Sequence, residues 1–342
     1  MQTNSASAAS GEPSVAVVLL NWNDPRPTLA CLEALRRLDY GNARFVVVDN
    51  GSGLDALQPL MALPDVELLC NGANLGFAGG VNVGLRHAFA ANAEYVWLLN
   101  NDAIPTPGAL KELVARAETE PSIGLLSPLL HDQGEAQRTN ACFGLFDHRA
   151  LGTTHTDDPG QARRWLAEHP ADILAFGTAL LIRRQLFEAI GGFDERLFAY
   201  AEDVDYCLRC TKAGFRVSFC FDAHVFHTFK DAMRDPDSCP PYLHYYISRN
   251  YPLLWRKLSG GPLLFTRAAL WFLRQRLLQI DRIAGNQVAI DAALAGIWDG
   301  VLGRGGAYDP GRKPPWLLKQ TLGRFPRTFI SLLDGKLPIR SL

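Results

Sequence analysis

Amide, carboxylate and imidazole side chains occur in this sequence where they could hold a divalent cation. Asn100-Asn101-Asp102 directly follows an apolar run, so its side chains would emerge at the end of a buried strand. A carboxylate there can hold Mg²⁺ or Mn²⁺ and leave the other coordination positions to phosphates and water. The same aspartate could instead cap the next helix or turn. His224 and His227 follow a later apolar run, and a neutral imidazole can bind a metal, although a histidine at such a place is more often a buried structural residue.

A second set of acids could transfer a proton. Asp194 lies two residues after Gly191-Gly192, and Glu202, Asp203 and Asp205 begin a charged helical pattern. Part of this acidity is explained by the preference for negative charge at a helix N-terminus. A carboxylate held within reach of an attacking hydroxyl group could also act as a general base. The spacing alone leaves both interpretations open.

The elements expected to position these residues alternate between apolar strands and amphipathic helices. Strands are predicted at 15–20, 45–48, 66–69 and 95–99, and helices at 28–38, 79–91 and 107–118. This alternation predicts a parallel, doubly wound α/β sheet. Ligands of such sheets bind outside the carboxyl ends of the strands. The sequence therefore predicts a ligand crevice formed by residues 21–24, 49–52, 71–76 and 100–102.

The second half of the chain is less regular. Residues 131–170 show little periodicity and are expected to be loop-like. A strand is predicted at 173–183, short helices at 187–192 and 203–213, and a further strand at 216–221. From Tyr242 onward the pattern is mostly helical, with breaks at Gly260-Gly261 and at 303–306.

Length and composition set the broad class of the protein. The chain has 342 residues, of which 48% are hydrophobic and 20% charged, and this composition excludes a disordered or collagen-like protein. Residues 1–14 are expected to form a flexible leader that lacks the basic and apolar regions of a secretory signal. Seven cysteines, an odd number, then predict a cytoplasmic protein with free thiols. No apolar run is long enough to predict a transmembrane helix.

Charge is divided unevenly along the chain. Residues 1–248 contain 19 Lys and Arg against 30 Asp and Glu, whereas residues 249–342 contain 15 against 5. An amphipathic pattern from Leu263 to Ile283 predicts a helix that packs mainly on the rest of the protein. The surplus of basic residues would face an anionic membrane, and we expect Arg267, Arg274, Arg276 and Arg282 to contribute. No basic and aromatic module typical of nucleic-acid binding is recognisable, so no nucleic-acid partner is expected.

Seven segments occur in an order that is informative as a set. They read VAVVLLNWN, VVVDNGS, NGANLGFAGGVNVGL, VWLLNND, FGTALLIRR, GGFDERLFAYAEDVDYCLR and HVFHTF. Through them the chain resembles glycosyltransferase family 2, in particular its bacterial rhamnosyltransferase-like branch. The resemblance implies a GT-A domain at 15–257, an α/β fold with a Rossmann-like, mostly parallel central sheet flanked by helices. A basic, mainly helical region would follow at 258–342.

The resemblance also implies roles for single residues. The residues that match its nucleotide-sugar donor site are Asn21, Asn23, Asp49, Asn50, Asn74, Gly76, Phe77, Asn100, Asn101, Gly177 and Thr178. Asn100-Asn101-Asp102 takes the place of the family's D-x-D motif, so Asp102 would bind the Mg²⁺ or Mn²⁺ ion, and His227, but not His224, matches a second metal ligand. Asp203 matches the catalytic base. Asp194 and Glu202 resemble acceptor-side or supporting residues.

The implied reaction is an inverting, metal-dependent sugar transfer in cell-surface polysaccharide biosynthesis. The leading expectation is rhamnose from dTDP-rhamnose, moved to a glycan or lipid-linked saccharide, with the protein in the cytoplasm or peripheral at the cytoplasmic face of the inner membrane. A UDP- or GDP-sugar donor is the alternative.

Three other classes of protein fit the sequence less well. A sugar nucleotidyltransferase should carry a glycine-rich, basic segment after the first strand, where Asn21-Trp22-Asn23-Asp24 stands. A dinucleotide oxidoreductase needs G-x-G-x-x-G, which GFAGGVNVG does not match. A sugar-binding module without activity would not need Asp102, Asp203 and His227 together.

Overall fold

The computed structural model describes residues 11–133, 139, 143–148, 152–227, 239–259 and 267–334. The chain divides into two compact units. Unit 1 comprises Met1–Gly144, His155–Phe193 and Tyr206–Thr228, and unit 2 comprises Leu145–Thr154, Asp194–Asp205 and Phe229–Leu342. Residues 1–10 of the expected leader lie outside the described residues, as do the predicted helix break at Gly260-Gly261 and Leu263 of the amphipathic pattern.

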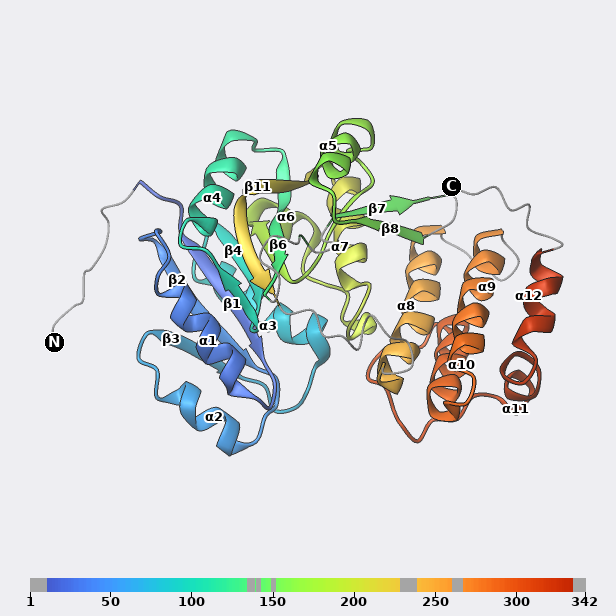
Figure 1. The fold of residues 1–342 in the computed structure, drawn as a ribbon. Coiled ribbons are helices and arrows are strands. Elements are labelled where there is room, and N and C mark those ends of the chain that lie inside the picture. Colours follow the sequence, from blue (N-terminus) through green and yellow to red (C-terminus); the bar gives the residue numbers. More distant parts are fainter. Residues whose placement is uncertain are drawn as a thin grey trace. The chain divides into compact units, whose positions relative to one another are not determined.

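Unit 1 contains an eight-stranded sheet in the order β3-β2-β1-β4-β10-β6-β11-β5 (Figure 1). The strands are β1 (Val15–Asn21), β2 (Ala43–Asp49), β3 (Val66–Cys70), β4 (Tyr95–Asn100), β5 (Ala103–Pro105), β6 (Ile123–Asp132), β10 (Ala179–Arg183) and β11 (Arg216–His227). The first four strands are parallel to one another, and β11 is parallel to β6. β10 runs antiparallel to β4 and β6, and β5 antiparallel to β11. The mostly parallel sheet predicted from the sequence is confirmed.

Helices alternate with the strands of this part of the chain. They are α1 (Pro25–Leu35), α2 (Leu54–Met61), α3 (Gly76–Ala90), α4 (Ala109–Thr119), α5 (Pro159–Glu168) and α6 (Arg184–Ile190), with α7 (Glu202–Lys212) following. Right-handed connections place α1 and α3 on opposite faces. Helix α3 lies very close to β1, because a Cβ atom at Gly84 would be 2.4 Å from Val18 Cγ1. The apolar runs of β1, β2 and β4 are buried between these layers.

Strand register aligns Asn21, Asp49 and Asn100 at the carboxyl ends of three strands. Asn21 pairs with Asp49, and Leu20 pairs with Asn100, so the carboxyl ends of β1, β2 and β4 coincide. In β5, the edge strand next to β11, Ala103 pairs with His227 of β11.

Strand β11 contains a bulge between Cys220 and His224. Cys220 pairs with Pro128 of β6, and the next pair joins His224 to Leu129. Residues 221–223 therefore have no partner on β6. Pro128, which has no N–H to donate, lies beside this bulge, a place where proline is tolerated within a sheet.

The prediction of a loop at 131–170 was wrong. This stretch contains β7 (Phe143–Asp147), β8 (Gly152–Thr156) and α5. β7 and β8 form a three-stranded sheet with β9 (Ile173–Ala175), in the order β8-β7-β9. Helix α5 is short and polar, but Asp158 caps it, Pro159 occupies its first turn, and it buries Ala162 and Trp165. The predicted strand at 173–183 is in fact two strands, separated by residues 176–178.

Unit 2 is mainly helical, as expected for the C-terminal region. Its elements are η1 (Glu195–Leu197), α8 (Pro241–Ser259), α9 (Arg267–Arg282), α10 (Gln287–Leu302), α11 (Trp316–Leu318), η3 (Lys319–Gly323) and α12 (Pro326–Asp334). Helix α10 packs on α8, and α12 packs on α9. Leu277 and Ile280 of α9 join a buried apolar cluster with α10, which supports the predicted packing role of this helix. Among the described residues, no helix meets the length and hydropathy needed to cross a bilayer.

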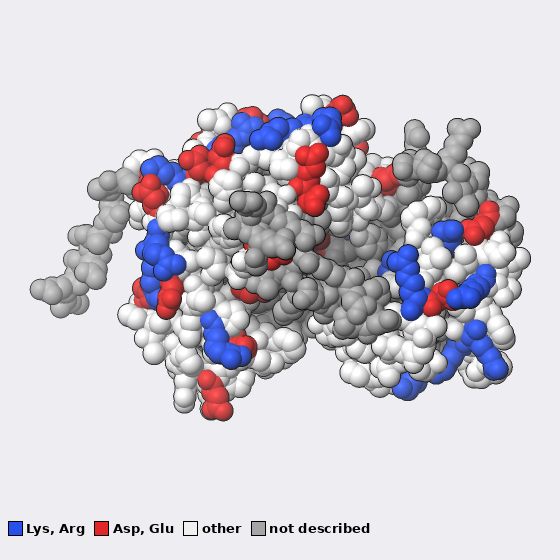
Figure 2. Space-filling view, in the orientation of Figure 1, with Lys and Arg blue, Asp and Glu red and all other residues white. Residues whose placement is uncertain are grey.

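Two of the arginines expected to face a membrane are used within unit 2. Arg274 forms an ion pair with Asp334. Arg276 lies over the ring of Phe272, and burial lowers its pKa to about 10. These contacts occupy both side chains within unit 2, and their expected contact with a membrane stays a prediction. Arg282 is exposed, and the side chain of Arg267 lies outside the described residues. On the face drawn in Figure 2, basic side chains still predominate over α9 to α12.

Candidate active site

The ends of β1 and β2 are joined by a buried polar network. The Asn21 amide donates to Asp49 Oδ1 at 2.8 Å, and the Thr28 hydroxyl donates to Asn21 Oδ1 at 2.7 Å. Asn101 in turn donates to Thr28 Oγ1 at 2.9 Å. Asp49 also accepts from the hydroxyl and the backbone N–H of Ser52. Asn21 and Asp49 are buried, so this network fixes the carboxyl ends of β1 and β2, whereas Asn23 beside it is exposed and adopts a positive φ of 64°.

Asn50 fixes the loop that leads into α3. Its amide nitrogen donates to Asn74 Oδ1 and to the carbonyl of Gly76, both at 3.0 Å. Its oxygen accepts from Asn71 and from the backbone N–H of Leu75, both at 3.1 Å. Asn50 is buried and Asn74 exposed, so the loop presents Asn74 to solvent from a rigid base.

The aligned strand ends bring Asp102 and His227 into contact. Asp102 Oδ1 lies 3.1 Å from His227 Nε2, and the Asn100 amide nitrogen lies 3.4 Å from the same imidazole atom. The β5–β11 register explains this meeting, because His227 pairs with Ala103, the residue after Asp102. The backbone N–H of Asn100 donates to the carbonyl of Thr178 at 2.8 Å. Gly177-Thr178 therefore lies beside the same strand end.

The pair Asp102 and His227 fits a divalent cation. Two neighbouring ligand atoms of an octahedral ion, each about 2.1 Å from it, are about 3 Å apart. The two protein atoms stand at 3.1 Å and would leave the remaining positions to phosphate oxygens and water. No group of three or more His, Cys, Asp or Glu side chains suited to a metal occurs in the described part of the chain. His224 bonds instead to His131, with ring nitrogens 2.9 Å apart.

Asn82 is a positioning residue that the sequence reading missed. It lies buried in α3, where its amide donates to the carbonyl of Phe193 at 2.9 Å and accepts from the N–H of Phe193 at 2.8 Å. A Cβ atom at Gly192 would lie 2.2 Å from Asn82 Oδ1, so a larger residue there would displace the Asn82 side chain. Phe77 of the same helix lies edge-on to Phe193, with ring centroids 6.4 Å apart. These contacts fix the backbone directly before Asp194.

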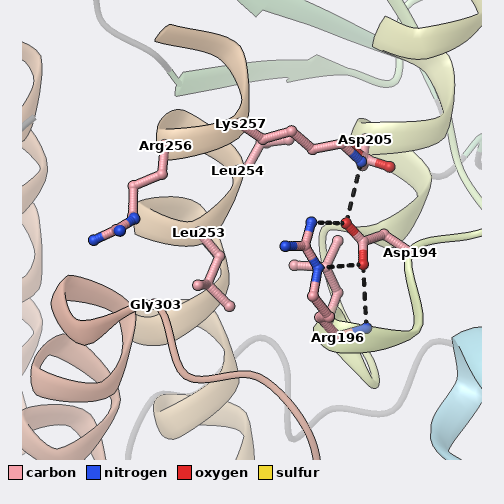
Figure 3. Close-up of a pocket in the computed structure, with 9 residues that line it drawn as sticks. Asp194, Arg196, Asp205, Leu253, Leu254, Arg256, Lys257 and Gly303 are labelled. Carbon is pink, nitrogen blue, oxygen red and sulfur yellow. Dashed lines mark hydrogen bonds and ion pairs between the residues drawn. The ribbon is translucent and has the colours of Figure 1, made fainter. Parts of the chain in front are cut away.

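In unit 2, Asp194 is held by two cations. It accepts from Arg196 Nε at 2.9 Å and Nη2 at 2.6 Å, and from Lys257 Nζ at 3.1 Å (Figure 3). Lys257 also pairs at 2.6 Å with Asp205, whose carboxylate is nearly fully buried. Burial alone would raise the pKa of Asp194, but hydrogen bonds from Arg196 and the charge of Lys257 outweigh burial and hold that pKa below its usual range. A cavity of about 300 Å³ lies among these four residues and Arg256. Both carboxylate oxygens of Asp194 accept hydrogen bonds from Arg196 or Lys257, which favours a supporting role over contact with the acceptor.

Glu202 and Asp203 differ sharply in environment. Glu202 is buried, and burial, followed by the charge of Asp203, raises its pKa to about 8. Asp203 is partly exposed, whereas Ala201, Glu202 and Val204 beside it are buried. Asp203 Oδ1 accepts the backbone N–H of Val204 at 2.8 Å. These surroundings favour the protonated form of Glu202, and the accessible carboxylate of the pair belongs to Asp203.

The backbone before these acids is strained. Phe198, Tyr200 and Ala201 have positive φ angles of 62°, 69° and 64°, which are costly for residues with a side chain. Asn250 of α8 stabilises this loop, because its amide nitrogen donates to the carbonyls of Leu197, Ala199 and Tyr200 at 2.9, 2.7 and 2.7 Å.

Arg249 reinforces the same loop. It is fully buried and donates to the carbonyl of Leu197 at 2.8 Å and to that of Gly306. Its guanidinium lies over the rings of Tyr245 and Tyr246, 5.2 and 4.9 Å from their centroids. We call Arg249 and Asn250 the loop clamp. The sequence reading missed it, although a charged residue and an amide flanked by tyrosines were a signal that could have revealed it.

Comparison with known proteins identifies related sequences. A family model described as "Glycosyltransferase like family 2" matches residues 13–239. The N-acetylglucosaminyl-diphospho-decaprenol L-rhamnosyltransferase of Mycobacterium tuberculosis is 32% identical over 256 residues, which cover 68% of this chain and 82% of the relative. The dTDP-rhamnosyl transferase RfbF of Shigella flexneri is 26% identical over 312 residues, which cover 86% of this chain and 99% of the relative.

Solved structures share the fold. A mannosyltransferase from Pyrobaculum calidifontis, solved with GDP-Man and Mn²⁺, matches with a TM-score of 0.53 and 17% identity, covering 94% of this chain and 84% of that protein. Residues 1–349 of TarS from S. aureus match with a TM-score of 0.53 and 16% identity, covering 94% and 88%. The predicted GT-A fold is confirmed by these likenesses.

Proposed function

Because this chain belongs to glycosyltransferase family 2, we propose that it transfers rhamnose from dTDP-rhamnose to a lipid-linked saccharide, with inversion at the anomeric carbon. The support for the sugar comes from two relatives, both named as rhamnosyltransferases. The M. tuberculosis relative is named for an acceptor on a diphospho-decaprenol lipid, which supports the acceptor class. The predicted catalytic domain boundary at residue 257 stays a prediction.

The observation that carries the proposal is the pair Asp102 and His227 at the carboxyl ends of the strands. Their atoms stand 3.1 Å apart beside Asn100, at the edge where α/β sheets bind nucleotides. A Mg²⁺ or Mn²⁺ ion held by the two would neutralise charge on the diphosphate leaving group.

The donor nucleotide would be bound by the crevice around these residues. We assign its contacts to Asn23, Asn74 and Phe77, which are at least partly exposed. The buried Asn21, Asp49 and Asn50 hold that surface in place, because their side chains are occupied by hydrogen bonds within the protein. Gly177-Thr178, beside Asn100, would line the sugar.

Asp203 is the proposed general base. Its carboxylate accepts the proton of the acceptor hydroxyl as that oxygen bonds to the anomeric carbon and the bond to the nucleoside diphosphate breaks. One such displacement inverts the configuration at that carbon. Burial favours the protonated form of Glu202, which would keep a second negative charge away from Asp203.

A transfer assay with a panel of dTDP-, UDP- and GDP-sugars tests this proposal. Asp203→Asn should lower turnover by about 10² or more and leave donor binding intact. Asp55→Asn is a matched control, because Asp55 is likewise the second residue of its helix, and it should transfer at the wild-type rate. NMR of the product gives the anomeric configuration. Retained configuration, or full activity of Asp203→Asn, would contradict the mechanism.

A further inference from the structure

The last part of unit 2 is an amphipathic segment with one covered side. Residues 313–334 contain α11, η3 and α12, and we call them the terminal segment. The inner side of this segment packs on the apolar cluster of α9 and α10 through Leu318, Leu322, Phe329, Ile330 and Leu333. The apolar residues of this side are therefore explained by packing within unit 2.

The outer side of the terminal segment exposes large apolar side chains. Trp316, Leu317, Phe325 and Leu332 are 72%, 64%, 53% and 60% exposed. Thr321 connects the turns that carry Leu317 and Phe325, because its hydroxyl donates to the Leu317 carbonyl and its carbonyl accepts from the Phe325 N–H, at 2.7 and 2.9 Å. Large apolar side chains gathered in one short segment mark an interaction surface.

The charge around these side chains is positive. In residues 267–334, four of the five aspartates form ion pairs: Asp281 with Arg327, Asp291 with Lys319, Asp299 with Arg304 and Arg312, and Asp334 with Arg274. Lys313 and Arg324 are exposed, and neither has a carboxylate partner within the described residues. The Arg324 guanidinium lies 5.7 Å from the ring centroid of Phe325. Arg324 therefore lies beside Phe325, and Lys313 lies three residues before Trp316 in the chain. No ion pair within the described residues cancels the charge of either cation.

We propose that this outer surface, formed by Lys313, Trp316, Leu317, Arg324, Phe325 and Leu332, docks the protein on an anionic lipid bilayer. The apolar side chains enter the boundary between headgroups and acyl chains, where tryptophan is favoured. The two cations approach lipid phosphates. The inference extends the proposed function by naming where the protein meets the membrane that carries a lipid-linked acceptor.

Vesicle sedimentation with the full chain, without donor or acceptor, tests the proposal. The probes are phosphatidylcholine vesicles with and without phosphatidylglycerol, at low and high salt. We expect binding only to the anionic vesicles, weakened by salt. Lys313→Gln and Arg324→Gln should each weaken binding by about fivefold at low salt. Trp316→Ala with Phe325→Ala should weaken it by about tenfold or more.

A matched control comes from unit 1, where Leu54 and Met61 of α2 are 73% and 66% exposed. Leu54→Ala with Met61→Ala should bind vesicles like the wild type. Absence of binding to anionic vesicles overturns the proposal, and so does binding that the outer-surface variants leave unchanged. A dimer in light scattering that Trp316→Ala abolishes would assign the surface to a second copy and also overturn it. Transfer to a short water-soluble acceptor should be unchanged in these variants, so failure of docking and failure of the proposed transferase activity are distinguishable.

Discussion

Replacing Asn250 by alanine tests whether the loop clamp holds Asp203 in its working position. The Asn250 amide nitrogen bonds to three loop carbonyls, and its oxygen accepts from Arg249 Nε at 2.8 Å. Asn250→Ala leaves these polar groups without their partner at a fully buried position. Each buried polar group that loses its partner costs about 1–3 kcal/mol, and part of the set can be reached by water, so we expect a loss of about 2–4 kcal/mol.

Because the loop is strained, the loss of stability in Asn250→Ala should be accompanied by a change in loop conformation. Phe198, Tyr200 and Ala201 at positive φ each cost about 1–2 kcal/mol, an amount that the clamp offsets in the native loop. Without Asn250, the loop can lower its energy by relaxing, and Asp203 follows directly in the chain. A displacement of about 1 Å at a catalytic group can cost about 10² in rate. The variant should therefore lose activity at temperatures where it remains folded.

The assay compares thermal unfolding with the rate of sugar transfer measured well below the unfolding transition. Asn286→Ala is the control for destabilisation within unit 2, because Asn286 caps α10 by accepting from the Ala289 N–H at 3.1 Å. Loss of that cap costs about 1 kcal/mol and should leave transfer unchanged. The reasoning fails if Asn250→Ala is destabilised yet transfers at the wild-type rate, or if Asn286→Ala loses as much activity.

Three further predictions concern the metal pair, the buried glutamate and the helix α3 contact. Asp102→Ala or His227→Ala should weaken metal-dependent donor binding in calorimetry by about tenfold or more, and unchanged affinity in both would place the metal elsewhere. Burial, and then the charge of the adjacent aspartate, raises the pKa of Glu202 from 4.5 to about 8, so the folded state keeps a proton that the unfolded chain releases. Stability should therefore fall as pH rises between these values, and Glu202→Gln should flatten that fall in denaturant titrations; an equally steep fall in the variant would refute this. Gly192→Ala would place Cβ 2.2 Å from Asn82 Oδ1 and should cost about 1–3 kcal/mol in unfolding experiments, whereas a neutral result would show that α3 yields easily.

The elements that could be predicted are those whose residues form a local hydrophobic pattern in the sequence. The apolar runs of β1, β2 and β4 are buried on both faces, so each stands out as a continuous stretch. Strand β6 was not predicted, because it contains Pro128. A proline is tolerated at this position only because it lies beside the bulge in β11. Helix α5 escaped prediction because only Ala162 and Trp165 mark its buried side.

The candidate site shows a similar division. The strand ends at Asn21, Asp49 and Asn100 follow from the rule for parallel sheets, and their alignment is confirmed. The meeting of Asp102 with His227 depends on a register between strands far apart in the sequence, and only the family resemblance pointed to it. Periodicity gives no signal for a buried side chain that binds the backbone of a distant loop, as Asn250 does.

The bulge in β11 separates two parts of the strand that can vary independently in length. Residues 221–223 have no partner on β6, so insertion or loss of a residue there need not shift the pairs on either side. From His224 to His227 every residue is paired with β6, and a single insertion would turn a different side chain toward Asp102. Evolution should therefore permit length variation among homologues at 221–223 and forbid it in the four residues that follow.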